Sequence, residues 1–322
     1  MKRRDFIRTS AIIAPMMSVF PADLSAVTRL SLPGKIEKRS LGRTGEMLSM
    51  IGFGGIIVTD ATPAEASESV KLAIDSGINY FDVAPSYGDA EIKLGPALEP
   101  YRKDVFLACK TTERGRDGAR KELEQSLKKM RTDHFDLYQF HAVTTKEDVE
   151  KIFEQGGALE TYLEARKEGK IRFIGFSAHS VEAAMGMMDR FDFDTILFPV
   201  NYVTWNSGNF GPQVLEKADS KNMGILALKA MAKGPWPEGF ENKDYPKCWY
   251  EPLTSTEDIK MGLGFTLSHP VTSALTPGDL RLFKTALNVS GSLKPLNDKE
   301  IQIIKQKATA GVPLFRYPGA QS

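Results

Sequence analysis

Short apolar runs alternate with amphipathic segments along most of the chain from Ile36 onward. Eight runs have the length and composition of buried strands: Ile51–Gly54, Tyr80–Asp82, Val105–Cys109, Leu137–Phe140, Phe173–Phe176, Thr195–Phe198, Ile225–Leu228 and Thr272–Leu275. Between them lie segments with helical spacing of apolar residues, such as Glu65–Asp75, Arg120–Met130, Leu159–Lys167, Val181–Arg190, Pro212–Lys221 and Thr256–Leu267. Eight strand–helix alternations predict an α/β fold, a closed (β/α)8 TIM barrel.

A β-hairpin is expected ahead of the barrel, because Ile36–Leu41 and Met47–Met50 flank the turn sequence Gly42-Arg43-Thr44-Gly45. Three glycines stand where a helix should end before the next strand, a position that suits left-handed backbone: Gly77, Gly169 and Gly224.

A doubly wound parallel sheet is the competing α/β fold. Such a sheet binds nucleotides through a Gly-x-Gly-x-x-Gly loop after its first strand. Here Gly52, Gly54 and Gly55 are interrupted by Phe53 and followed by two isoleucines, which does not suit a phosphate-binding loop. The pattern therefore favours the barrel.

Two segments that follow predicted strands are longer than a plain connection. Tyr202–Gly211 follows the sixth barrel strand and Ala232–Pro252 follows the seventh. Both are expected at the barrel face where active sites lie. The second is rich in aromatic residues, which either line a pocket for a flat or sugar-like molecule or pack the loop against itself: Trp236, Phe240, Tyr245, Trp249 and Tyr250.

The first 26 residues have the order of features of an export signal. A basic start, Lys2 to Arg8, precedes the short apolar run Ala11 to Phe20, and the small residue Ala26 follows. The pair Arg3-Arg4 followed by Phe6 looks like a twin-arginine signal, which exports folded proteins to the periplasm. The alternative is a basic, disordered N-terminus.

Composition and charge argue against a membrane-spanning segment, a nucleic-acid partner and a zinc site. Residues 27–35 are expected to be a linker, 36–315 the barrel and 316–322 a tail, without a transmembrane segment. The formal net charge is +1, and removal of the basic N-terminus leaves the remainder near −1, which argues against nucleic acid as a partner. The two cysteines, Cys109 and Cys248, do not form a zinc-binding pattern, and no metal is predicted.

Four ionisable residues are expected to meet at the catalytic face of the barrel. Asp82, Lys110 and His141 each end a predicted strand, and Tyr87 follows Asp82 by five residues. A buried lysine and aspartate are tolerated as an ion pair. A nearby ammonium should lower the pKa of Tyr87 and suit it to proton transfer. Individually, each residue has a structural alternative: a helix cap, a packed ring or a core hydrogen bond.

The chain resembles the aldo-keto reductases in the segments that carry these residues. The resemblance rests on Gly77–Gly88 with Glu91 and Leu94-Gly95, on Leu41–Gly45 with Gly52–Gly55, on Asp136–His141, and on Gly169–Arg172 with Ile174–Ser177. It implies an oxidoreductase of the EC 1.1.1 type that transfers hydride between a nicotinamide cofactor and a carbonyl or alcohol, with a sugar-like compound as one candidate. It assigns Tyr87 as general acid/base, Lys110 and Asp82 as tuning residues, and His141 as the group that orients the carbonyl.

The resemblance also implies a site for NAD or NADP, although several of the family's residues differ here. The candidates for cofactor binding are Gly54, Ser177, Asn201, Lys229, Gly278 and Arg281. Ala178 and His179 stand in place of the family's Asn, and Asn201 replaces a Gln. Leu228-Lys229 lacks the family's stacking Tyr. Asp279 would oppose a cofactor phosphate, so the sequence does not indicate a preference for NADP.

Two alternatives to a reductase that exchanges cofactor remain. Free nicotinamide cofactor is scarce outside the cytoplasm, so an exported enzyme could retain its cofactor and modify a sugar without net redox change. The other alternative is a binding protein on a barrel scaffold, which the altered cofactor residues favour and the complete set Asp82, Tyr87, Lys110 and His141 opposes.

Overall fold

A computed structural model of the chain describes residues 36–241 and 244–318. Eight parallel strands form a closed barrel in the order β12-β3-β4-β5-β6-β7-β8-β9. The strands are β3 (Ile51–Gly54), β4 (Tyr80–Asp82), β5 (Phe106–Thr111), β6 (Phe135–Val143), β7 (Ile171–Ala178), β8 (Thr195–Pro199), β9 (Gly224–Leu228) and β12 (Ser273–Leu275). All eight coincide with predicted strands, and the barrel prediction is confirmed. The export signal and linker, predicted at 1–26 and 27–35, lie outside the described residues, as does the end of the tail.

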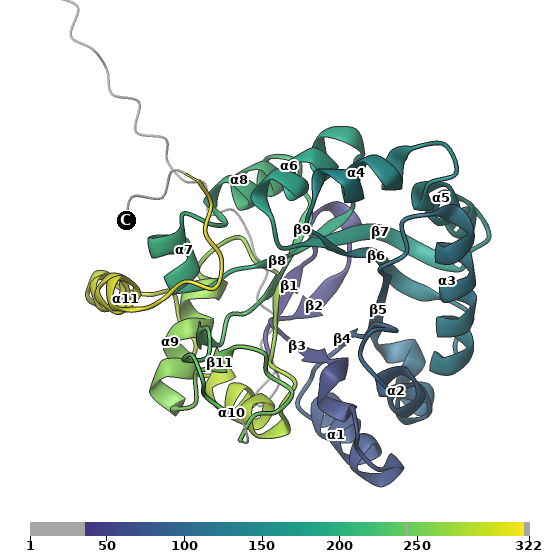
Figure 1. The fold of residues 1–322 in the computed structure, drawn as a ribbon. Helices are drawn as coiled ribbons and strands as arrows, with labels where there is room; N and C mark the ends of the chain where they lie inside the picture. Colours follow the sequence, from purple (N-terminus) through teal and green to yellow (C-terminus); the bar gives the residue numbers. More distant parts are fainter. Residues whose placement is uncertain (1–35, 242–243, 319–322) are drawn as a thin grey trace, which may run out of the picture.

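Helices surround the barrel (Figure 1). They are α1 (Pro63–Asp75), α2 (Ala90–Leu98), α3 (Arg116–Met130), α4 (Lys146–Phe153), α5 (Ala158–Lys167), α6 (Val181–Arg190), α7 (Tyr202–Gly208), α8 (Pro212–Ser220), α9 (Thr256–Leu267), α10 (Leu280–Ser290) and α11 (Asp298–Ala310). Their apolar faces and the outward side chains of the strands form the main hydrophobic core. No helix in the described ranges is long and apolar enough to span a bilayer.

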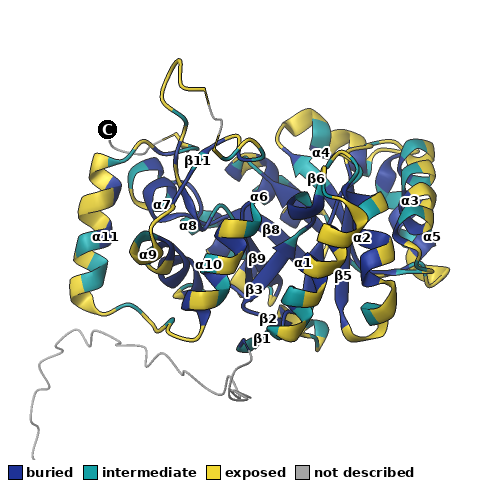
Figure 2. Ribbon diagram, turned by 90° about the horizontal axis from the view of Figure 1, so that it is seen from below, coloured by how far each residue is buried: buried dark blue, intermediate teal, exposed yellow. Residues whose placement is uncertain are grey.

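The predicted hairpin closes the N-terminal end of the barrel. Strands β1 (Lys38–Ser40) and β2 (Met47–Ser49) pair antiparallel around the short helix η1 (Gly42–Thr44). Leu41 and Leu48 are fully buried and belong to the apolar cluster inside the barrel. Figure 2 shows the hairpin at the end of the barrel opposite to β11 (Glu251–Pro252).

Of the three glycines predicted to have a left-handed backbone conformation, Gly77 and Gly169 have it and Gly224 does not. Gly77 has φ 89° and Gly169 has φ 75°. Before β9 the left-handed residue is Asn222, with φ 53°, instead of Gly224. Gly224 allows the Leu41 side chain of the hairpin to pack directly against β9, because a Cβ at this position would lie 2.4 Å from Cδ1 of Leu41.

The two long segments after barrel strands contain more secondary structure than predicted. Helix α7 occupies most of the segment that follows β8, because the side chain of Asn201 caps its first amides. After β9, β10 (Ala232–Gly234) pairs antiparallel with β11. We call the described residues between these two strands, 235–241 and 244–250, the strap. It lies at the catalytic end of the barrel (Figure 2).

Candidate active site

The four predicted catalytic residues meet at the C-terminal ends of β4, β5 and β6. The Lys110 ammonium forms an ion pair with the Asp82 carboxylate. Tyr87 packs edge-on against His141, with ring centroids 5.7 Å apart. The Nζ atom of Lys110 lies 5.3 Å from the centroid of the Tyr87 ring. One phenol, one imidazole and one ion pair therefore share a single site.

The Asp82–Lys110 pair is buried inside the barrel, and neighbouring polar groups also hold the carboxylate. Both side chains are buried, and Asp82 also accepts hydrogen bonds from the Tyr80 hydroxyl at 3.2 Å and the Gln139 amide at 3.1 Å. Burial alone would lower the pKa of Lys110, but the Asp82 carboxylate and Tyr87 together outweigh it and the pKa rises to about 12. Lys110 is therefore a permanent cation behind Tyr87.

The expected lowering of the Tyr87 pKa is wrong in direction. Burial raises the pKa of Tyr87 and outweighs the opposing effect of the Lys110 ammonium, while the Asp82 carboxylate adds to the rise. A nearby ammonium favours the phenolate, but burial removes the solvent that would stabilise its charge, and this second effect is the larger one. Tyr87 consequently keeps its proton at neutral pH.

His141 is held as a neutral imidazole. Burial and the nearby Lys110 ammonium lower its pKa to about 2. Its Nδ1 atom lies 3.3 Å from the Ser86 hydroxyl. Arg114 donates to the backbone carbonyl of His141 at 2.7 Å, and the following residue, Ala142, has a left-handed φ of 52°. Arg114 thus fixes a strained backbone position beside a candidate catalytic group.

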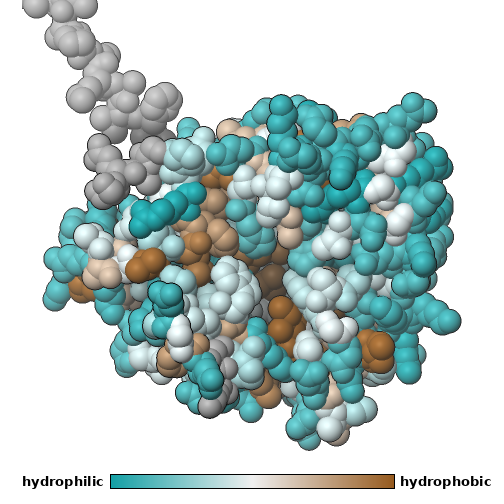
Figure 3. Space-filling view, in the orientation of Figure 1, coloured by the Kyte–Doolittle hydropathy of each residue, from teal (hydrophilic) through white to brown (hydrophobic). Residues whose placement is uncertain are grey.

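A cavity of about 90 Å³ adjoins this site, and several predicted cofactor residues line it. Gly54 and Gly278 are among them, with Asp82, Tyr87 and Lys229. Gly278 packs on Ile56, since a Cβ there would lie 2.2 Å from Cγ2 of that side chain. Figure 3 shows this face of the molecule, which is hollowed at its centre with hydrophobic side chains beside the hollow.

Two hydroxyl groups are suited to hold polar parts of a cofactor. Ser177 accepts a hydrogen bond from the Ala142 amide at 2.8 Å, which leaves the hydroxyl proton available to a ligand. Thr276 lines the cavity, and its buried hydroxyl lacks a hydrogen-bond partner among the described residues. A buried hydroxyl without a protein partner beside a cavity is suited to hydrogen-bond a polar group of a ligand. These residues fit a nicotinamide cofactor, although Leu228 provides no aromatic ring for stacking.

Asn201, a predicted cofactor residue, contacts backbone groups of the chain through its side-chain amide. Its amide nitrogen donates to the carbonyls of Lys229 at 3.2 Å and Ala232 at 2.6 Å. Its amide oxygen accepts from the backbone amides of Val203 and Thr204. Both ends of the Asn201 side chain join α7 to the turn after β9. These contacts leave the amide little hydrogen-bonding capacity for the nicotinamide.

Arg281 is also engaged within the protein. It donates two hydrogen bonds to Asp279, at 3.0 and 2.7 Å, one to the Asp244 carbonyl, and lies over the Tyr245 ring. The sequence indicated that Asp279 would repel a cofactor phosphate. It did not indicate that Asp279 forms an ion pair with Arg281. The Asp279 carboxylate therefore offsets the charge that Arg281 would offer to a cofactor phosphate.

The strap is fastened across the mouth of the barrel. Lys247 donates to the backbone carbonyl of Ile57 at 3.2 Å and also to that of Thr59. The Trp236 indole donates to the Cys248 carbonyl at 2.8 Å and stacks on Phe240 with ring centroids 5.0 Å apart. Both alternatives for the aromatic loop therefore apply: Trp236 and Phe240 pack on each other, while Tyr250 lines the cavity.

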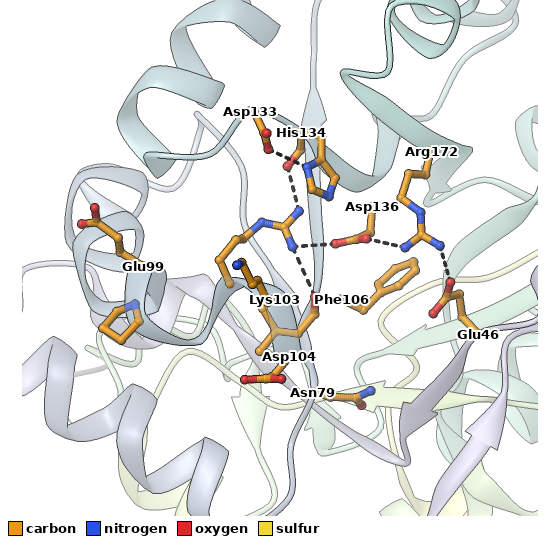
Figure 4. A pocket seen from close by; sticks show the side chains of 13 residues that line it. Glu46, Asn79, Glu99, Lys103, Asp104, Phe106, Asp133, His134, Asp136 and Arg172 are labelled. Atoms are coloured by element: carbon orange, nitrogen blue, oxygen red, sulfur yellow. Dashed lines mark hydrogen bonds and ion pairs between the residues drawn. The ribbon is translucent and has the colours of Figure 1, made fainter.

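A pocket of about 850 Å³ lies at the hairpin end of the barrel and carries a structural ion network (Figure 4). Asp136 pairs with Arg102 at 3.0 Å and with Arg172 at 2.6 Å, and Arg172 also pairs with Glu46 on the hairpin. These paired charges attach the hairpin to the barrel, and this end is not the catalytic face. No cluster of three or more potential metal ligands occurs in the part of the chain that the structure describes.

Sequence reasoning did not identify Gln139, Tyr80 and Ser86 as members of the site. Two of them could have been found from strand periodicity. Gln139 lies two residues before His141, and Tyr80 two residues before Asp82, so each shares an inward face with a candidate catalytic residue. Ser86 lies in a loop, where no such periodicity applies.

Comparisons with known proteins agree with this geometry. The family model described as the Aldo/keto reductase family matches residues 50–289. L-galactose dehydrogenase from Arabidopsis thaliana is 29% identical over 216 residues, which is 62% of this chain and 67% of that protein. The 6-dehydroglucose reductase from Novosphingobium aromaticivorans is 32% identical over 159 residues, 43% of this chain and 50% of that protein.

Solved structures give the same fold. The holo form of aldo-keto reductase AKR11C1 from Bacillus halodurans superposes with a TM-score of 0.67 and 20% identity, over 88% of this chain and 99% of that one. At this level of identity the likeness bears on the fold alone.

Proposed function

The chain belongs to the aldo/keto reductase family, and we propose that it transfers hydride between NAD or NADP and a carbonyl or alcohol, with Tyr87 as general acid/base. The observation that carries the proposal is the placement of a protonated phenol between a permanent ammonium and a neutral imidazole. In reduction, the carbonyl carbon gains a hydride and its oxygen gains a proton, and the product is an alcohol. Oxidation is the same step in reverse.

Each residue has a defined part in the proton transfer. The Tyr87 hydroxyl donates its proton to the carbonyl oxygen as negative charge develops there. The Lys110 ammonium stabilises the phenolate that remains, and Asp82 keeps Lys110 in place. His141 donates a hydrogen bond to the same carbonyl oxygen, with Ser86 donating to Nδ1 so that the imidazole proton is on Nε2.

The nicotinamide cofactor, when bound, supplies or accepts the hydride at C4 of its ring. Ser177 and Thr276 would hold its polar groups, and Gly54 and Gly278 contribute to the lining of the cavity. Because Arg281 is engaged with Asp279, we propose no preference for NADP over NAD.

A sugar-derived carbonyl is the substrate class that we favour. Two relatives are named for sugars, L-galactose dehydrogenase and 6-dehydroglucose reductase. Aromatic side chains of the strap, Trp249 and Tyr250, lie beside the cavity mouth, and aromatic faces suit the apolar faces of sugar rings.

The proposal is tested by the decrease in absorbance at 340 nm when the protein is mixed with NADH or NADPH and a panel of sugar and aromatic aldehydes. We expect turnover by the wild type and a loss of about 10²-fold or more in Tyr87→Phe, the general acid/base contribution. Phe retains the packing against His141, so the thermal midpoint of the variant should stay near that of the wild type. Equal rates in the two proteins would refute the role of Tyr87.

A redox-neutral enzyme with a retained cofactor is the second candidate, and the fastened strap favours it. Lys247 and Arg281 attach the strap at two places across the mouth, which would slow cofactor release. Purification from the native source, denaturation and mass spectrometry tests this candidate. Stoichiometric NAD(P) would support it, whereas an empty protein that then turns over added cofactor would support the simple reductase. An empty protein that binds neither NADH nor NADPH would leave the barrel as a binding protein.

We also propose export to the periplasm through the twin-arginine machinery, on the basis of Arg3-Arg4 and the apolar run that follows. Replacement of both arginines by lysine should keep the protein in the cytoplasmic fraction. Export of that variant at wild-type levels would contradict the proposal.

A further inference from the structure

Lys229 is held in a strained conformation at the end of β9. Its φ is 69°, in the left-handed region that residues other than glycine seldom occupy. Two hydrogen bonds to its carbonyl maintain the conformation, one from the buried Asn201 amide at 3.2 Å and one from the Ala232 backbone amide at 2.9 Å. Strain that the surroundings enforce in this way is characteristic of functional positions.

The Lys229 ammonium is enclosed by aromatic rings. It lies 4.5 Å from the centroid of Tyr250 and 4.8 Å from that of Trp249. Cation–π contacts offset part of the cost of removing an ammonium from water without neutralising it. Among the described residues, Lys229 forms no ion pair, and the cage leaves its charge available to a ligand.

The cavity that Lys229 lines has an excess of positive charge. Asp82 is the one carboxylate among the described residues that line it, and Lys110 already neutralises it. Lys247, the other lining cation, is fixed to backbone carbonyls of the loop after β3. Burial lowers the pKa of Lys229 to about 8, so the ammonium still predominates at neutral pH. An anion in this cavity would meet an unmatched cation.

We propose that the substrate carries a carboxylate in addition to its carbonyl, and that Lys229 binds this carboxylate while Tyr87 and His141 face the carbonyl. The inference rests on the proposed function. Lys229 and Tyr87 line the same cavity, so a substrate whose carbonyl meets Tyr87 can present a second group to the Lys229 ammonium. The other anion that could reach Lys229 is the diphosphate of the cofactor, and the experiment below separates the two.

The test compares a matched pair of aldehydes, 4-carboxybenzaldehyde and its neutral methyl ester. For the wild type we expect kcat/KM for the acid to exceed that for the ester by about 10- to 100-fold, the usual value of a hydrogen-bonded charge pair. In Lys229→Met the ratio should fall to about one. Lys233→Met is the matched control, because this lysine lies nearby on β10, is exposed and pairs with Glu251 at 2.6 Å. The control should keep the wild-type ratio.

Two binding measurements complete the test. Calorimetry should show that benzoate binds the wild type and not Lys229→Met, and fluorescence titration should give similar NADH and NADPH affinities for both. A wild-type acid-to-ester ratio near one, or a ratio that persists in Lys229→Met, would overturn the inference. If Lys229→Met loses affinity for the cofactor but keeps the acid-to-ester ratio of the wild type, Lys229 binds the cofactor diphosphate instead. If no aldehyde is reduced but benzoate binding depends on Lys229, the proposed reductase function fails and the carboxylate site stands.

Discussion

Removal of one partner from the buried Asp82–Lys110 pair should destabilise the protein strongly. The two side chains are 1% and 0% exposed, so neither charge can be hydrated when the other is lost. Breaking a buried pair costs about 3–5 kcal/mol of unfolding free energy. In Lys110→Met, Asp82 would keep the hydrogen bonds from Tyr80 and Gln139, which places the expected loss toward the lower end of that range.

The double substitution Asp82→Asn/Lys110→Met should cost much less than the sum of the single changes. Both charges are then absent, and neutral groups of similar size occupy the same space. We expect a coupling of at least about 2 kcal/mol between the two sites. Activity should still be lost in the double variant, because the ammonium behind Tyr87 is missing.

Urea unfolding followed by circular dichroism measures these differences. Lys71→Met is the control, because Lys71 and Asp75 form an exposed pair with side chains 64% and 60% accessible, and its midpoint should match that of the wild type. Additive effects of the two buried substitutions, or a single-variant loss below about 1 kcal/mol, would refute the reasoning that the charges depend on each other.

Three further predictions concern the titration of the site and the hairpin. Because burial raises the pKa of Tyr87, the rate of reduction of a neutral aldehyde should stay level to about pH 10 and fall only above it; a fall near neutral pH in that rate profile would contradict this. His141 and His179 have folded-state pKa values of about 2 and about 4, below the ordinary value of about 6.5, because burial disfavours the charged imidazoles. The unfolded chain therefore binds more protons, and the unfolding free energy should fall from pH 6.5 to pH 4 by up to about 1.4 kcal/mol per pH unit for each histidine. Urea titrations of the His141→Gln/His179→Gln variant should show a shallower decline. Finally, Gly42→Ala should destabilise the protein more than Gly45→Ala, since both glycines are left-handed but only at Gly42 would a Cβ collide with backbone, 2.3 Å from the Gly224 nitrogen; equal thermal midpoints would exclude this steric effect.

The barrel could be predicted because the signals that define it are local. Each barrel strand is a short apolar run, and β4 ends at Asp82 and β5 passes through Lys110, so strand ends also predicted which side chains meet. Helix α2 was not singled out, because Gly95 and Pro96 within it are poor helix formers and tertiary packing overrides them. A similar limit applies to α7, whose start depends on the Asn201 cap.

The parts of the site that the sequence did not predict depend on contacts between distant segments. The pKa of Tyr87 reflects how deeply the folded chain buries the phenol, which no local pattern reports. The aromatic cage around Lys229 brings together residues from β9 and from the far end of the strap. The position of Asn201 matches a cofactor-binding position of the family, but its side-chain contacts with backbone groups of this chain depend on the folded structure.

The central claim is that this barrel transfers hydride with Tyr87 as the proton donor, and isotope transfer tests it most directly. The protein would be incubated with NADH or NADPH deuterated at C4 and an aldehyde, and the alcohol product analysed by mass spectrometry. The account predicts one deuterium on the former carbonyl carbon with the wild type and a rate reduced by about 10²-fold or more with Tyr87→Phe. An absence of deuterium transfer from either cofactor, with either face of the nicotinamide labelled, would contradict the account.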